Sequence, residues 1–185
     1  MAKVSRGSLF HGCSGKMGNL VFRTRGNVTT VSKWQGSKKT KPSVRQEKVQ
    51  GNFGRAAKYA KEAIRDAALV ALYTPKAVDG KSVYNVAFAD AFHSPVVEAI
   101  DATGYRGEVG GTILIKATDD FKVARVSISV FSGEDGLIET GDAVVREDGI
   151  WMFTAMERNR DWEDCRVLVM AWDLPGNVGG MEVRL

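Results

Sequence analysis

Residues 122–131 read KVARVSISVF, and from Arg125 to Val130 polar and apolar side chains alternate strictly. A period of two is typical of a β-strand that has one face on a core and the other toward solvent. Residues 166–172, RVLVMAW, are almost entirely apolar, which indicates a central strand of the same fold. These two stretches predict that the C-terminal half of the chain is a β-structure.

Five further strand-like stretches surround these two: 96–100, 111–118, 137–145, 150–155 and 178–185. Turn residues separate them at 133–136, at Asp148-Gly149 and at 175–177. Seven short strands with turns about every eight to twelve residues are typical of a β-sandwich, and a small barrel is the alternative.

Several recognisable motifs lie along these predicted strands and turns. They are GYRG at 104–107, ILIKATDD at 113–120, VARVSI at 123–128, GIWMFTA at 149–155 and AWDLPGN at 171–177. Through them, residues 96–185 resemble the bacterial immunoglobulin-like modules of multidomain surface and virion proteins. The resemblance implies an immunoglobulin-like sandwich and leaves the ligand open, because that fold carries unrelated functions.

The N-terminal stretch predicts a β-hairpin. Residues 20–25, LVFRTR, and 28–34, VTTVSKW, flank a turn at Gly26-Asn27. A lone hairpin is marginally stable in water, so we expect it to pack on another element or another chain.

A basic helix is predicted over residues 43–72. Ser43 and Gln46 form a capping box after Pro42. Gly51 and Gly54 each cost about 1 kcal/mol relative to Ala, so the helix needs packing to persist. Its apolar stripe recurs at spacings of three and four: Val49, Phe53, Ala56, Ala60, Ile64, Ala67 and Ala71.

The sequence thus predicts an α+β protein in three parts. Residues 1–80 form a basic module of hairpin plus helix, and 81–95 hold a short helix, from Ser82 to about Phe92, and a connector. Residues 96–185 form the sandwich.

The charge distribution divides the chain. Residues 1–66 carry 15 Lys and Arg against 3 Asp and Glu, a net charge of +12, whereas residues 67–185 carry 11 against 19, a net of −8; the sum is +4. A basic arm is suited to a polyanion or an acidic protein surface. The predicted contact residues are Lys16, Arg23, Arg25, Lys33, Trp34, Lys38, Lys39, Lys41, Arg45 and Lys48.

Trp34 allows two interpretations. Lying between Lys33 and Lys38, it is placed to stack on a nucleobase or to anchor in a groove of a partner. Equally, it can cap the hairpin by packing against the helix.

Two N-terminal motifs carry a second resemblance: SGKMGNLVF at 14–22, and a helix with Gln46, Val49, Phe53, Ala56-Ala57 and Tyr59. They resemble small, uncharacterised bacterial and prophage-encoded proteins, some from the neighbourhood of phage-like structural genes. The family pattern has Arg where this chain has Gln50 and Gly51. The resemblance implies a part in a virion or a contractile injection assembly.

No stretch forms a catalytic motif. Gly12, Gly15 and Lys16 lack the spacing, the Ser or Thr, and the following helix of a phosphate loop. A nucleophilic Cys13–His11 pair would need a third, orienting group, and none is evident. We therefore expect no enzymatic activity, no cofactor and no small-molecule substrate, and we expect Cys13 and Cys165 to be reduced thiols.

Acidic and amide side chains at strand ends are candidates for a metal-binding site. Asp119, Asp120, Asp173 and Asn177 could converge at one pole of the sandwich, where oxygen ligands suit calcium. Turn capping by Asp and Asn explains these residues without metal, and we expect none.

The sequence therefore predicts a non-enzymatic structural or assembly protein. Its N-terminal module docks into a larger complex, through a protein partner or by self-assembly, and its sandwich is displayed or mediates contacts. The alternative is a non-specific nucleic-acid-binding protein that uses the basic arm. Residues 1–18 have no apolar segment of a signal peptide, and no apolar run is long enough to cross a bilayer, so a cytoplasmic or particle-incorporated protein is expected.

Overall fold

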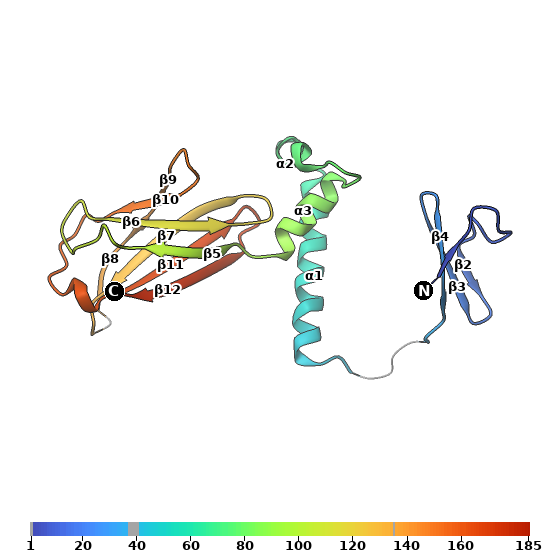
Figure 1. Cartoon of the computed structure of the whole chain (residues 1–185), viewed down its shortest axis with the longest axis horizontal. Helices are drawn as coiled ribbons and strands as arrows, with labels where there is room; N and C mark the ends of the chain where they lie inside the picture. The colour runs from blue at the N-terminus through green and yellow to red at the C-terminus, as the bar shows by residue number, and fades with distance from the viewer. Residues whose placement is uncertain (1, 37–40, 135) are drawn as a thin grey trace. The chain divides into compact units, whose positions relative to one another are not determined.

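The computed structural model describes residues 2–36, 41–134 and 136–185. The chain forms two compact units, Met1–Ser43 and Val44–Leu185. Three helices and three antiparallel sheets make it a mixed α and β structure, which agrees with the predicted α+β class (Figure 1).

The N-terminal unit is a four-stranded antiparallel sheet in the order β1-β4-β3-β2. Its strands are β1 (Ala2–Val4), β2 (Gly15–Met17), β3 (Leu20–Arg25) and β4 (Val28–Lys33). The predicted hairpin is confirmed, since Arg25 lies opposite Val28 and a two-residue turn joins β3 to β4. Gly26 has φ +53° there, a left-handed conformation that glycine adopts without a steric cost.

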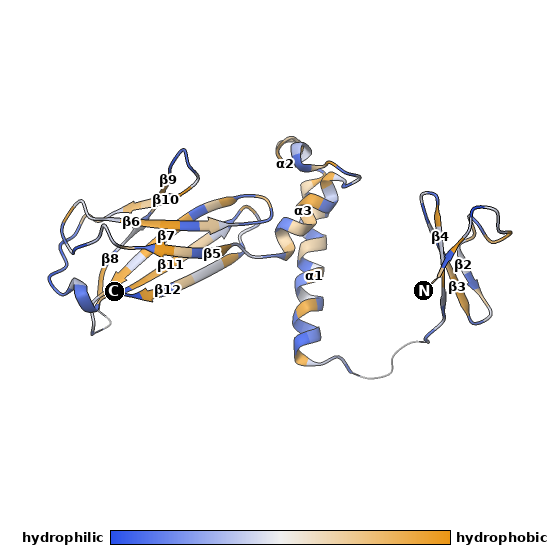
Figure 2. Ribbon diagram, viewed as in Figure 1, coloured by the Kyte–Doolittle hydropathy of each residue, from blue (hydrophilic) through white to orange (hydrophobic). Residues whose placement is uncertain are grey.

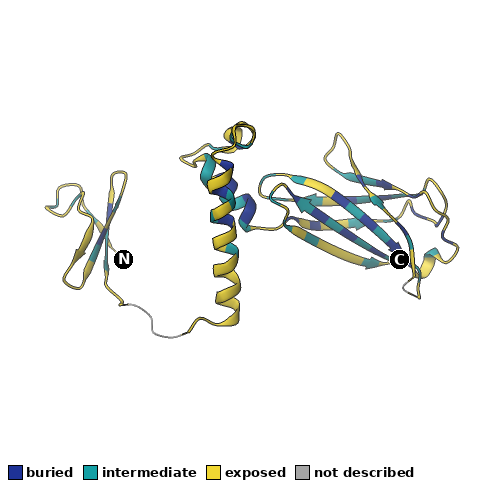
Figure 3. Cartoon of the chain, turned by 180° about the vertical axis from the view of Figure 1, so that it is seen from behind, coloured by how far each residue is buried: buried dark blue, intermediate teal, exposed yellow. Residues whose placement is uncertain are grey.

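This unit has a very small interior. Among its described residues, only Phe22 and Thr29 are buried (Figure 3). Phe10 stacks on Phe22 with ring centroids 5.4 Å apart. So little buried apolar surface gives the sheet little stability of its own.

The predicted helix over 43–72 is two helices, α1 (Val44–Ala63) and α2 (Ala67–Tyr73), followed by a 3₁₀ turn, Thr74–Lys76. The helix is interrupted at Asp66, whose side chain accepts hydrogen bonds from the Ala68 and Leu69 backbone N–H groups, at 2.8 and 3.2 Å. Asp66 is thereby the N-cap of α2. The next helix, α3 (Val83–Phe92), has Ser82 as its N-cap, within the range predicted for it.

Helix α1 packs on α3 through small side chains and one aromatic ring. Ala60 and Ala63 form a buried cluster with three residues of α2 and α3: Tyr73, Val86 and Ala87. Phe53 remains more than half exposed, but its ring packs edge-on against Phe88 of α3, with centroids 4.9 Å apart. The predicted apolar stripe is only partly correct, because Val49 and Ile64 remain exposed and the first half of α1 is mostly yellow in Figure 3.

Two four-stranded antiparallel sheets form the rest of the second unit, in the orders β5-β6-β10-β9 and β12-β11-β7-β8. The first holds β5 (Val96–Asp101), β6 (Thr112–Thr118), β10 (Trp151–Thr154) and β9 (Val144–Val145). The second holds β12 (Val178–Arg184), β11 (Arg166–Asp173), β7 (Val123–Phe131) and β8 (Leu137–Asp142).

Both sheets contribute to one core. Ile113 and Ile115 of the first sheet pack with Val126, Ile128 and other buried residues of the second, and apolar side chains alternate along these strands in Figure 2. The alternation predicted for 122–131 is confirmed on β7. In β11 burial also alternates, with Val167, Val169 and Ala171 fully buried and the residues between them partly exposed. The apolar run 166–172 is thus covered fully on one face only.

The predicted strand 137–145 is two strands in different sheets. Leu137–Asp142 pairs with β7 in the second sheet, whereas Val144–Val145 pairs with β10 in the first. Buried Ala143 lies at the crossing and donates its backbone N–H to the Val126 carbonyl at 2.9 Å. A stretch with uniform strand propensity carries no signal of this change of partner.

The helices belong with the β part rather than with the N-terminal sheet. Tyr73 of α2 lies on Phe121 of the β6–β7 turn, with ring centroids 4.5 Å apart, and Lys76 donates to the Phe121 carbonyl at 2.6 Å. The unit boundary at Ser43 therefore differs from the boundary near residue 80 expected from the sequence. That expectation grouped the basic helix with the basic hairpin, whereas the helix packs with the β part. Within the described ranges, no helix combines the length and apolarity needed to cross a membrane.

Candidate functional site

The strand register gathers four cations on one face of the N-terminal sheet. Lys3 and Arg23 both lie opposite Thr30, and Lys16 lies opposite Val21. Residues directly opposite each other, and residues two apart on one strand, share a face. Lys3, Lys16, Arg23 and Arg25 therefore form one surface, here called the basic face, and all four are exposed.

The connection between β1 and β2 contacts the opposite face. Phe10 stacks on Phe22, the Gly12 N–H donates to Thr29 Oγ1 at 2.8 Å, and Thr24 Oγ1 donates to the Cys13 carbonyl at 2.8 Å. Phe22, Thr24 and Thr29 belong to the face that the basic residues do not share. The small interior of the unit therefore lies on one side, and the cations lie on the other.

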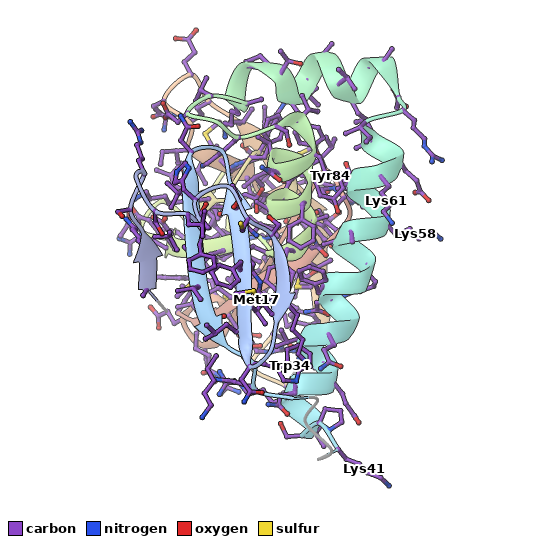
Figure 4. All side chains as sticks on the ribbon, turned by 90° about the vertical axis from the view of Figure 1, so that its right-hand side faces the viewer. Met17, Trp34, Lys41, Lys58, Lys61 and Tyr84 are labelled. Carbon is purple, nitrogen blue, oxygen red and sulfur yellow. The ribbon has the colours of Figure 1, made fainter. Side chains whose placement is uncertain are left out.

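Trp34 follows β4 and lies beside the basic face. Its indole is half-exposed, and the Lys16 ammonium lies 4.5 Å from the ring centroid, a cation–π contact. Trp34 lines a shallow pocket with Val21, Arg23 and Ser32. Figure 4 labels Trp34 and Met17, two exposed apolar side chains of this sheet. Stacking of Trp34 on a base or in a groove stays a prediction.

The other predicted contact residues are more dispersed. Lys33 lies opposite Leu20, on the face away from Arg23, and Lys41 is exposed beyond the sheet. Lys38 and Lys39 lie outside the described residues. Arg45 and Lys48 belong to α1, in the second unit, where Lys58 and Lys61 also project outward (Figure 4).

Sequence reasoning missed Lys3. A three-residue strand at the chain start carries almost no periodic signal, and only its pairing with β4 places the side chain on the same face as Arg23, with Thr30 between them. Residues 1–43 contain nine Lys and Arg and no Asp or Glu, a count that already included Lys3.

The residues considered for catalysis are engaged elsewhere. His11 Nε2 lies 3.2 Å from the Asn27 carbonyl. The other histidine, His93, was not a catalytic candidate, and its Nδ1 lies 2.6 Å from Asp120 Oδ2. Lys16 lies in strand β2, which does not lead into a helix as a phosphate loop would. Cys165 is buried, and this burial raises the pKa of its thiol; Cys13 is exposed.

Two of the four residues considered for calcium do converge. One carboxylate oxygen each from Asp119, Asp173 and Asp90 lie within 4.8 Å of one another, and we call these three residues the acidic cluster. Asp120 instead pairs with His93. Asn177 donates to the cluster: its backbone N–H to Asp173 Oδ1 at 2.6 Å and its Nδ2 to Asp173 Oδ2 at 2.7 Å.

Asp90 was not predicted, because it lies in the apolar helix 83–92, far in sequence from the other two. It is fully buried, and the Tyr73 hydroxyl donates to its Oδ2. Tyr59 in turn hydrogen-bonds the Tyr73 hydroxyl at 2.9 Å. Burial is the main cause that raises the pKa of Asp90 to about 7, and the neighbouring Asp119 carboxyl raises it further. Burial also raises the pKa of Asp173, against the hydrogen bonds from Asn177.

Comparison with known proteins leaves the chain without an assigned family. No protein-family model matches it, and no curated protein is similar to it. One crystal structure of an engineered protein is similar over 55% of this chain and 25% of that chain, with 10% identity and a TM-score of 0.30. The chain thus spans about a quarter of that protein.

Proposed function

We propose that this chain is a non-enzymatic assembly protein whose basic face docks onto an acidic surface of a larger protein complex, while the β part is displayed or makes lateral contacts. The observation that carries the proposal is the one-sided N-terminal sheet. It presents four cations on one face and contains no carboxylate in residues 1–43. A partner surface of opposite charge would complement it.

Two exposed apolar side chains support docking through this face. Val28 lies opposite Arg25 on the basic face, and Trp34 lies beside Lys16. A partner that covered them would add apolar burial that the sheet lacks.

The β part suits a display or contact role if it is an immunoglobulin-like sandwich. The order β5-β6-β10-β9 corresponds to strands A-B-E-D of that fold, and β12-β11-β7 corresponds to G-F-C, with β8 added beside C. This correspondence supports the resemblance of residues 96–185 to such modules. The resemblance of the N-terminal part supports a phage-like or contractile-injection complex as the setting.

A second candidate is non-specific nucleic-acid binding, and Trp34 is the observation that favours it. A half-exposed indole beside Lys16 and Arg23 combines a stacking surface with phosphate-binding cations. Affinity would then fall steeply with salt, since each neutralised phosphate releases counterions.

Sedimentation in extracts of cells that naturally produce the protein tests both. The comparison uses the wild-type chain, an Arg23→Gln/Arg25→Gln variant, and a Lys81→Gln/Lys122→Gln variant, which removes two cations from the other unit. Assembly predicts that the wild type and the Lys81/Lys122 variant sediment with large particles before and after nuclease treatment. The Arg23/Arg25 variant stays near the top of the gradient.

Two outcomes would contradict assembly through the basic face. Release of the wild type by nuclease would favour the second candidate instead. If all three proteins sediment identically, as monomers or as particles, the basic face is not the surface that docks. Circular dichroism of the purified variants verifies that each is folded.

A further inference from the structure

The acidic cluster brings three carboxylates together from three separate elements. Asp90 lies in α3, Asp119 lies in the turn between β6 and β7, and Asp173 ends β11. The cluster therefore lies where the helical part meets one pole of the β part. It is distinct from the basic face, and the inference drawn from it is independent of the proposed function.

Each carboxyl group is held by a hydrogen-bonding partner. The Tyr73 hydroxyl donates to Asp90 Oδ2; the Phe121 and Lys122 N–H groups donate to Asp119 Oδ2, at 3.1 and 3.2 Å. Asn177 holds Asp173 through its backbone and side-chain nitrogens. Partners of this kind fix the orientation of ligating carboxylates in metal sites.

One oxygen each of Asp90 and Asp119 is inaccessible to solvent and accepts no hydrogen bond from any other described group: Asp90 Oδ1 and Asp119 Oδ1. Asp90 is fully buried, and its carboxyl group lies close enough to that of Asp119 for the two to share a proton. In the described parts of the chain, no Lys, Arg or His forms an ion pair with any of the three carboxylates. Buried carboxylates without a compensating group are costly, so this arrangement points to a missing positive ligand.

A proton compensates the charges and unpaired oxygens of the three carboxylates less completely than a divalent cation does. One shared proton would neutralise one carboxylate of three and join two of them. A divalent cation neutralises two charges and takes a lone pair from all three groups. We propose that Asp90, Asp119 and Asp173 bind one Ca²⁺ ion that fastens the helical part to the pole of the β part.

The three carboxylates favour calcium among the hard cations. Ca²⁺ accepts several carboxylates, through one or both oxygens and in flexible geometry, so three carboxylate oxygens that all lie within 4.8 Å of one another can bind one ion. Mg²⁺ demands a near-ideal octahedron, usually binds one or two carboxylates and keeps several waters. The three carboxylates together offer six oxygens toward the six to eight ligands that Ca²⁺ takes.

The test uses the full chain, freed of metal with EDTA and then titrated with CaCl₂ or MgCl₂ while thermal unfolding is measured. At about one hundred times the Kd, Ca²⁺ raises Tm by about 5–10 °C, since the ligand binds only the folded state. Terbium provides a second measurement. Tyr73 touches Asp90 and can sensitise Tb³⁺ luminescence, and Ca²⁺ should displace that signal.

Three substitutions separate binding from structural damage. Asp90→Asn and Asp173→Asn abolish both the Ca²⁺-dependent rise in Tm and the terbium signal. Without metal, Asp90→Asn is at least as stable as the wild type, because it removes a buried charge. Asp120→Asn, which removes the neighbouring carboxylate that pairs with His93, keeps both responses.

Three results would overturn the proposal. The first is an unchanged Tm of the wild type at about 10 mM CaCl₂, a concentration about tenfold above the weakest affinities of protein calcium sites. The second is a calcium response that persists in Asp90→Asn and Asp173→Asn. The third is a response to Mg²⁺ as strong as that to Ca²⁺, which would refute the assignment to calcium.

Discussion

Adding one methyl group at two glycines should change stability in opposite directions. Gly179 lies in β12 against the connection from α3 to β5, and a Cβ built there would lie 2.8 Å from the Pro95 carbonyl carbon and nearer still to its oxygen. Ordinary carbon–carbon contacts are about 3.5–4.0 Å. The backbone must therefore move by about 1 Å to relieve the contact with the carbon, and by more to relieve the contact with the oxygen. Overpacking of this kind costs about 1–3 kcal/mol.

Gly51 is the matched control. It is an exposed residue of α1, and a methyl group added to its Cα would have no neighbouring atom within 4 Å. Ala is favoured over Gly in a helix by about 1 kcal/mol. We expect Gly179→Ala to lower the free energy of unfolding by about 2 kcal/mol. Gly51→Ala should raise it by about 1 kcal/mol.

Urea unfolding measures both changes. Fluorescence of Trp151 and Trp172 follows unfolding of the β part, to which both belong, while circular dichroism at the helix band follows the helices, including α1. The difference between the two variants is then about 3 kcal/mol, well above the error of such extrapolations. Equal effects of the two substitutions, or a neutral Gly179→Ala, would refute the packing of β12 against Pro95.

Three further predictions concern the acidic cluster and the thiols. In EDTA, the free energy of unfolding should fall by a few kcal/mol as pH rises from about 4 to 7. The reason is that folding raises the pKa of Asp90 to about 7, so the folded state binds this proton more tightly than the unfolded state does. Urea midpoints measured across this range should fall less for Asp90→Asn, which leaves the neighbouring groups unchanged: Tyr59, Tyr73, Asp119 and Asp173. Tyr73→Phe should cost about 1–3 kcal/mol in the same assay, since Asp90 loses its donor, and a loss no larger than that of Tyr84→Phe would contradict this role. A thiol reagent such as DTNB should label exposed Cys13 quickly and Cys165 only on unfolding; rapid labelling of both would show that Cys165 is not in a closed core.

Local patterns in the sequence were sufficient for most of the elements. The alternation of residues 122–131 specified β7, and Gly26-Asn27 specified the turn between β3 and β4, because side-chain period and turn conformation are properties of neighbouring residues. Ser82 likewise specified the start of α3 through its own hydroxyl. The excess of Lys and Arg in the N-terminal part was also evident from the sequence alone.

Only the tertiary structure decided which residues act together. The basic face depends on the pairing of β1 with β4, which brings Lys3 onto the same face as Arg23. The crossing at Ala143 depends on which sheet offers a partner. The acidic cluster joins Asp90 to residues 29 and 83 positions away along the chain. Burial there, rather than residue type, leaves one oxygen each of Asp90 and Asp119 without a hydrogen-bond donor. A linear sequence carries no measure of burial between distant segments.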